Sequence, residues 1–189
     1  SAINYDFGNA TDLDFQKIIF NNSYTKIMNI NLRGYMCEYD FDRCSGLISN
    51  PHLYLNEQTA GNYTRYLWEG AYSPNDSVFY ASTTWISASQ TDTSRLFQFK
   101  LTDPNILSSI DTLGYWKRPY YAGAVRLAPD NKIYVTNPYF TGGAYYPYPA
   151  DSGYNYASMN LSVINEPDQL GAACNFQPFS FYLGGKRTY

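Results

Sequence analysis

Two similar segments decide the fold. They are GAYSPNDSVFYAST at residues 70–83 and GAVRLAPDNKIYVTN at residues 123–137. Each copy predicts a strand, a tight turn and a second strand. Proline presets φ at the second turn position, and Asn or Asp tolerates the dihedrals that follow. The residues after the turns, 78–81 and 133–136, are mostly β-branched or aromatic, as strands prefer. We therefore predict two β-hairpins of one design.

Further strands accompany these hairpins at a regular spacing. A third strand is predicted in each unit, at residues 36–41, 96–101 and 161–165. A fourth follows a turn rich in Gly, Pro, Asn or Asp, at residues 47–55, 106–113 and 177–184. The inner strands of the first unit are predicted at residues 14–20 and 25–31. The sequence therefore repeats with a period on the order of 60 residues, with four short strands in each unit and no helix.

A periodic unit of four strands is typical of a β-propeller blade. We predict an all-β chain, a single segment 1–189, that forms a partial propeller of about three four-stranded antiparallel blades at residues 10–56, 63–115 and 119–185. A β-sandwich or a jelly roll is the alternative. Propellers usually close with four to eight blades. The chain is therefore expected to belong to a larger propeller or to pair with another chain that covers its open edges.

The composition excludes several classes of protein. Charged residues make up 15% of the 189 residues and aromatic residues 19%, including 21 tyrosines, which argues against disorder. Tyrosine suits a pleated, half-exposed surface, so the composition is typical of extracellular β-structure. The formal net charge of −3 argues against a nucleic-acid partner, which would require a basic stripe. No apolar run approaches the roughly 20 residues that span a bilayer.

Four short sequence segments occur in the same order as in one group of proteins that this chain resembles. They are YDFDRCSGLISNP, YSPNDSVFY, LAPDNKIYV and LSVINEP, at residues 39–51, 72–80, 127–135 and 161–167. Together they resemble the propeller region of large secreted or cell-surface proteins of the Bacteroidetes, which often carry a gliding-motility-associated or type IX secretion sorting module. The resemblance spans roughly residues 35–185. It implies an extracellular or outer-surface location and a propeller that continues beyond Gly185.

The sequence offers few residues for catalysis. His52 is the only histidine, and zinc sites need three or four nitrogen or sulfur ligands, so we expect a partly exposed strand residue and no metal or cofactor. Paired carboxylates could still cleave a polysaccharide. The candidates for that alternative are Asp12, Asp14, Glu38, Asp40, Asp42 and Glu69.

Three cysteines, Cys37, Cys44 and Cys174, are too few for a disulfide scaffold. Buried free thiols are expected, and a bridge from Cys174 to one of the others is the alternative.

Tyrosine and tryptophan gather in the segments between the predicted strands. In a propeller the loops between second and third strands and those between blades emerge on one face, and long loops carry function disproportionately. The candidate ligand-binding residues are Trp85, Trp116, Tyr120, Tyr121, Tyr139, Phe140, Tyr145, Tyr146, Tyr148, Tyr154 and Tyr156. These rings either contact a ligand or pack on one another. We therefore expect a non-catalytic binding or adhesion module for a glycan or a surface protein, with a polysaccharide-degrading enzyme segment or a structural subunit of a surface assembly as alternatives.

Overall fold

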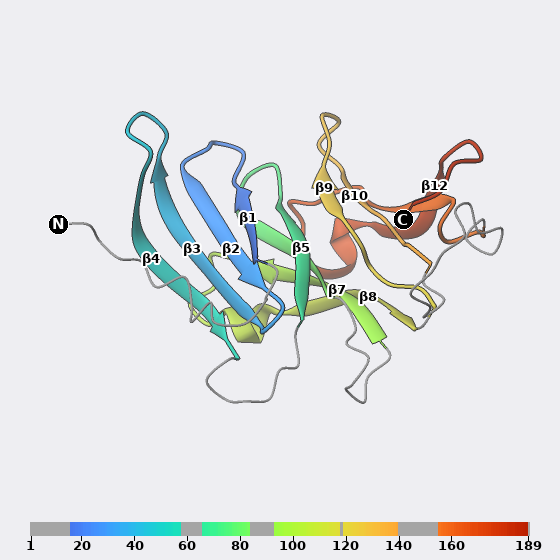
Figure 1. Ribbon diagram of the computed structural model, residues 1–189, viewed down its shortest axis with the longest axis horizontal. Helices are drawn as coiled ribbons and strands as arrows, with labels where there is room; N and C mark the ends of the chain where they lie inside the picture. The colour runs from blue at the N-terminus through green and yellow to red at the C-terminus, as the bar shows by residue number, and fades with distance from the viewer. Residues whose placement is uncertain (1–15, 58–65, 84–92, 118, 140–154, 189) are drawn as a thin grey trace.

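The structure is a computed structural model that describes residues 16–57, 66–83, 93–117, 119–139 and 155–188. It contains three four-stranded antiparallel sheets, each with its strands in sequence order (Figure 1). Sheet 1 consists of β1 (Gln16–Phe20), β2 (Lys26–Asn31), β3 (Tyr35–Asp42) and β4 (Leu47–Asn56). Sheet 2 consists of β5 (Leu67–Tyr72), β6 (Val78–Thr83), β7 (Thr93–Lys100) and β8 (Asp111–Lys117). Sheet 3 consists of β9 (Val125–Leu127), β10 (Ile133–Val135), β11 (Asn160–Ile164) and β12 (Phe176–Tyr182).

The all-β class and the three four-stranded antiparallel units predicted from the sequence are confirmed. One prediction was wrong in detail, because residues 106–109 do not extend. They form the short 3-10 helix η2 (Ile106–Ser109), and β8 begins only at Asp111. The hydroxyls of Ser108 and Ser109 donate to the backbone carbonyls of Asn105 and Ile106, at 2.7 and 2.9 Å. Such local side-chain bonds hold the backbone in a turn and compete with strand pairing.

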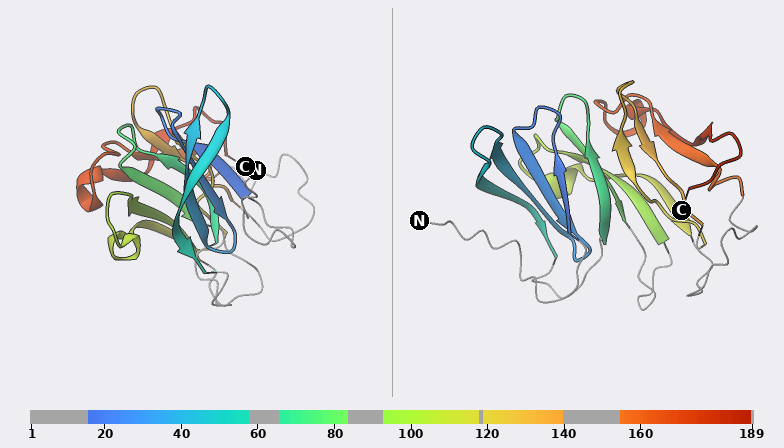
Figure 2. Two further views of the ribbon diagram at one scale, coloured as in Figure 1. Left: turned by 90° about the vertical axis from the view of Figure 1, so that its left-hand side faces the viewer. Right: turned by 45° about the horizontal axis from the view of Figure 1, so that its top comes forward.

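The three sheets lie side by side, with sheet 2 in the middle (Figure 2). Sheet 1 packs Met28, Ile30 and Met36 against Phe79 and Phe99 of sheet 2, and all five side chains are fully buried. Because these residues lie opposite one another in the strand registers, they form one apolar face on each sheet.

The other face of sheet 2 packs against sheet 3. Tyr80 and Leu96 of sheet 2 meet Val125, Ile133 and Ile164 of sheet 3, again with no side chain exposed. The strand β6 is therefore buried along its whole length. A strand covered on both faces need not alternate apolar and polar residues, which is why VFYAST lacks the alternation that marks β7.

The repeated phrases begin with Gly-Ala because the glycine lies against a neighbouring strand. A Cβ atom at Gly70 would lie 2.5 Å from the ring of Phe79 and 2.8 Å from the backbone oxygen of Tyr80. At Gly123 a Cβ atom would overlap the side chains of Thr136 and Pro138. Both positions therefore require a residue without a side chain.

The turns of the repeated hairpins have the predicted conformation. Asp76 and Asn131 occupy the same turn position with φ of 61° each, in the left-handed region that Asp and Asn tolerate. Asp76 also joins two sheets, because its carboxylate accepts bonds from the backbone N–H of Asn22 at 2.9 Å and from the Asn21 amide at 3.0 Å. The β1–β2 and β5–β6 turns consequently lie side by side at one end of the molecule (Figure 1).

All three cysteines are free thiols, so the alternative of a bridge to Cys174 is not realised. Cys37 and Cys174 are buried as predicted, whereas Cys44 is exposed in the turn between β3 and β4, so the prediction of burial was wrong for this residue. Within the described part of the chain, no helix is both long and apolar enough to cross a membrane.

Candidate functional site

The first strands of the three sheets lie next to one another and line a cavity that is open to solvent. β5 contacts β1 on one side and β9 on the other. Between them lies a space of about 390 Å³, within the usual range for small-ligand sites. It is lined by Lys17, Ile18, Ile19, Phe20, Asn22, Glu69, Gly70, Ala71, Tyr72, Arg126 and Leu127.

Three charged side chains, one from each sheet, meet at this cavity. Glu69 of β5 has a side chain only 7% exposed, and its Oε2 accepts a hydrogen bond from Arg126 Nη2 of β9 at 2.9 Å. Lys17 Nζ of β1 lies 3.5 Å from the same oxygen. A buried carboxylate is costly unless it is paired, so the two cations explain how Glu69 is tolerated there. We call these residues the Lys17–Glu69–Arg126 site.

The strand registers place these side chains on different faces of their sheets, so their convergence depends on where the strands lie. Lys17 lies opposite Ile30 on the face of sheet 1 that packs against sheet 2. Glu69 lies opposite Ser82 on the face of sheet 2 that packs against sheet 3. Arg126 is held by a bond from its Nη1 to the carbonyl of Val125 at 2.9 Å. Each residue lies on the first strand of its sheet, where the three sheets come closest, so long side chains from neighbouring sheets can meet.

The site combines an acceptor with unused donors. Both cations contact Oε2 of Glu69, and Oε1 accepts no hydrogen bond from any described residue. Lys17 and Arg126 have side chains 38% and 60% exposed, so their remaining N–H groups face solvent. The cavity can therefore accept a hydrogen bond from a ligand hydroxyl and donate hydrogen bonds to a ligand oxygen at neighbouring points.

The site does not supply paired acids for glycoside cleavage. Among the described residues that line the cavity, Glu69 is the only carboxylate. Of the other candidates, Asp12 and Asp14 lie outside the described residues. Asp40 accepts a bond from the Asn50 amide at 2.8 Å. Asp42 caps a turn, and the hydroxyl of Ser45 and the N–H of Cys44 lower the pKa of its carboxyl.

The remaining candidate acid, Glu38, lies in a closed polar cluster between sheets 1 and 2. Its carboxylate accepts bonds from Tyr72 Oη at 2.8 Å, Tyr54 Oη at 3.2 Å and Lys26 Nζ at 2.7 Å. Burial raises the pKa of both phenols, and the charge of Glu38 raises it further. Both phenols therefore stay protonated and donate to Glu38, which assigns this cluster to the packing of the two sheets.

The aromatic residues predicted to bind a ligand occupy different environments. Trp116 is 7% exposed and packs edge-on against Phe176, between sheets 2 and 3. Tyr120 and Tyr139 are half-buried and form an isolated bridge with their rings 5.4 Å apart. The predicted residues outside the described part of the chain are Trp85, Phe140, Tyr145, Tyr146, Tyr148 and Tyr154.

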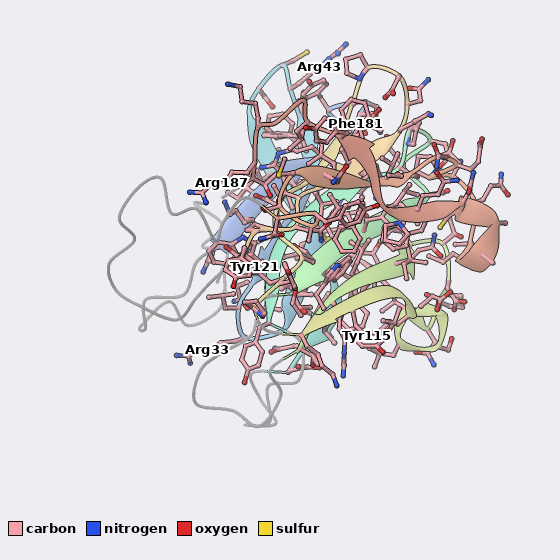
Figure 3. The ribbon with its side chains drawn as sticks, turned by 90° about the vertical axis from the view of Figure 1, so that its right-hand side faces the viewer. Arg33, Arg43, Tyr115, Tyr121, Phe181 and Arg187 are labelled. Atoms are coloured by element: carbon pink, nitrogen blue, oxygen red, sulfur yellow. The ribbon has the colours of Figure 1, made fainter. Side chains whose placement is uncertain are left out.

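The other two described aromatic candidates are Tyr121 and Tyr156. Tyr156 is 70% exposed and donates to the carbonyl of Phe179 at 3.3 Å. Tyr121 is half-buried, and in Figure 3 it lies well apart from the exposed residues Tyr115 and Phe181. The rings of Tyr115, Tyr121 and Phe181 therefore do not form one continuous binding surface.

His52 is an exposed residue of β4, as predicted, with its ring 4.5 Å from that of Tyr54. Within the described ranges, no group of three or more His, Cys, Asp or Glu side chains is placed to hold a metal ion.

The sequence analysis named Glu69 but missed Lys17 and Arg126. One signal could have found them: each first strand carries a charged residue inside a largely apolar run, as in KIIF, LWEGAY and VRL. A charged residue on a strand that is expected to be the innermost strand of its sheet indicates an ion pair or a ligand site.

Comparisons with known proteins add little to this geometry. No protein-family model matches the sequence, and no curated protein matches it. Among solved structures, a luciferin-regenerating enzyme is similar to this chain with a TM-score of 0.43 and 18% sequence identity. The similarity covers 63% of this chain and 36% of that chain, so the match spans about a third of the length of that protein.

Proposed function

We propose that the three sheets are consecutive blades of a β-propeller. In a propeller the first strand of every blade lies innermost and each blade packs face to face with the next. The contacts of β5 with β1 and β9 and the burial of sheet 2 on both faces support this arrangement. A sandwich of two sheets would leave one face of each sheet in solvent.

The chain acts, in this proposal, as a non-catalytic module that binds a glycan at the Lys17–Glu69–Arg126 site. The observation that carries the proposal is the buried carboxylate of Glu69, held at Oε2 by two cations and with no described partner at Oε1. A sugar hydroxyl is a suitable donor for that oxygen. The side chains of Ile19 and Leu127 supply apolar walls for a sugar ring. A secreted or cell-surface location fits this role and the tyrosine-rich composition.

Glycan binding is tested with the variant Glu69→Gln. An amide oxygen accepts a weaker hydrogen bond than a carboxylate and holds the two cations less firmly, so affinity should fall about tenfold. The measurement is titration calorimetry with the oligosaccharide that binds best in a glycan panel. Glu166→Gln, at an exposed position, is the matched control and should bind like the original protein. Failure of every glycan to bind, or equal affinity of Glu69→Gln, contradicts the proposal, and release of reducing ends would favour the enzyme alternative.

We also propose that further β-sheets, from the same polypeptide or another chain, cover the outer faces of sheets 1 and 3. On sheet 1, Ile18 and Leu53 lie at the two ends of one row across the strands and are 59% and 54% exposed, while Asn29 and Cys37 between them are buried. On sheet 3, Phe181 lies on the face away from sheet 2, next to the ring of Tyr134, and is 47% exposed. The packing of sheet 2 against a neighbouring sheet on each face supports this proposal.

If further sheets cover the outer faces of sheets 1 and 3, the native particle should be heavier than this chain alone. We expect light scattering to give a mass well above the 21.6 kDa of this chain. Leu53→Lys should weaken that assembly or lower its melting temperature, because it places a charge in a buried interface. Leu107→Lys, at a residue of equal exposure (53%) on η2, is the control and should change neither. A stable 21.6 kDa monomer that Leu53→Lys does not affect would contradict covering sheets.

A further inference from the structure

We infer that the sugar residue taken by the Lys17–Glu69–Arg126 site carries a single negative charge. This inference rests on the proposed glycan site and adds the class of sugar that binds there.

The charge balance of the cavity is positive. Of the described residues that line it, Lys17 and Arg126 are cations and Glu69 is an anion, which leaves one positive charge in excess. Tyr72 does not alter this balance, because its phenol is protonated and donates to Glu38, away from the ion pairs. An uncharged ligand would leave the excess charge partly desolvated and unpaired, which is unfavourable. A ligand with one negative charge would neutralise the site.

The unused donors lie next to the unused acceptor. Arg126 uses Nη1 for the carbonyl of Val125 and Nη2 for Glu69, and a guanidinium carries five N–H groups in all. Lys17 directs its ammonium to the same Oε2 of Glu69 and carries three donors. A carboxylate or sulfate ester can therefore contact one or both cations while a hydroxyl of the same sugar donates to Glu69 Oε1. Acidic sugars bring both groups together on a single ring.

The rest of the cavity limits how much charge the ligand carries. Ile19 and Leu127 make part of the wall apolar. The carboxylate of Glu69 lies within 3.5 Å of both cations and would repel a densely charged group. The formal charge of the whole chain is −3, which also disfavours a long polyanion. A single anionic group per sugar ring fits these features better than a phosphate-rich ligand.

The test compares pairs of oligosaccharides that differ only in charge. The first pair is tetragalacturonate and the same tetrasaccharide with its carboxyl groups methyl-esterified, and the second is a sulfated galactan fragment and its desulfated form. We expect one acid to bind at least tenfold tighter than its neutral counterpart at about 0.05 M salt, with the ratio shrinking at about 0.5 M salt because salt screens exposed charges. The acid that shows the larger ratio identifies the group as carboxylate or sulfate ester.

Variants of Lys17 and Arg126 test whether the preference for an acidic sugar depends on these two cations. Arg126→Gln and Lys17→Met should each bring the ratio of acid to neutral affinity close to one, because each removes one of the two cations. Arg95→Gln, at an exposed position of β7, is the control and should leave the ratio unchanged. A ratio near one in the original protein, or a ratio that survives in both variants, overturns the inference of an acidic sugar while the glycan site stands. If no member of either pair binds and the wider glycan panel also fails, the proposed function fails with it.

Discussion

Raising the pH above about 10 should unfold this protein over a narrow range, because several buried tyrosines must ionise when the chain unfolds. Tyr39, Tyr72 and Tyr80 are at most 2% exposed. Burial is the main cause that raises the pKa of each phenol above its ordinary value of about 10. The Glu38 carboxylate raises the pKa of Tyr72 further, and bonds with Tyr35 and Cys37 raise that of Tyr39.

The direction of the effect follows from proton counting. Below pH 10 these phenols are protonated in both states, so their contribution to stability is fully present. Above pH 10 the unfolded chain releases protons that the folded chain retains, and stability falls as the pH rises toward the folded-state pKa values. Each group costs about 1.4 kcal/mol for every pH unit, so three groups together cost about 4 kcal/mol per unit. A domain of ordinary stability would unfold within a few pH units.

Urea denaturation at several pH values, together with the ultraviolet absorbance of tyrosinate, measures this slope. Tyr72→Phe should lower the slope above pH 10 by about 1.4 kcal/mol per pH unit, because one titrating group is gone. Phe79→Leu changes the ring that packs 5.1 Å from Tyr72 and should lower stability equally at all pH values without changing the slope. A stability that stays flat up to pH 12 would show that these phenols are accessible to solvent in the folded protein.

Replacing Gln98 with leucine should destabilise the protein by about 3 kcal/mol or more, because several buried polar groups lose their partners. Gln98 is 1% exposed on β7 and joins sheet 2 to the loop before β12. Its Nε2 donates to the carbonyl of Gln169 at 2.8 Å and to Tyr80 Oη at 2.7 Å, and its Oε1 accepts from the N–H of Gly171 at 2.8 Å. Leucine has a similar volume but satisfies none of these groups.

Two measurements separate this effect from a general loss of packing. Urea denaturation gives the loss of stability, and limited proteolysis shows whether residues 166–175 become the first point of cleavage, as expected when their anchor is lost. Gln177→Leu, at an exposed position of β12, is the matched control and should change stability by no more than about 0.5 kcal/mol. If Gln98→Leu were as stable as the original protein, the hydrogen bonds between sheet 2 and this loop would not hold the sheets together.

Local sequence was sufficient to predict strands and turns. The two Pro-Asn/Asp turns and the apolar segments after them specify hairpins without reference to the rest of the chain, and Asp76 and Asn131 have the expected positive φ. Residues 106–109 were missed because two serine hydroxyls bond to nearby carbonyls. A four-residue segment of two apolar residues and two serines does not reveal which of two local bonding patterns prevails.

The candidate site could be predicted only in part. Glu69 was recognisable as a carboxylate, but its partners lie 52 residues before it and 57 residues after it, and no local pattern links them. The aromatic residues were predicted to bind a ligand because they are abundant between the predicted strands. Trp116 illustrates the difficulty, since an aromatic residue at a strand end is equally suited to a ligand and to a core, and here it packs between two sheets.

The sequence by itself determined the all-β class, the four-strand period and the hairpin turns, because these depend on dihedral preferences and on residues close together in the chain. Only the tertiary structure decided which first-strand charges meet, since Lys17, Glu69 and Arg126 come from three sheets whose packing brings them together. It also decided why Gly70 is a glycine, because the ring that leaves no room for a side chain belongs to the neighbouring strand. Contacts between sheets depend on geometry summed over many residues, and no short segment of sequence records that geometry.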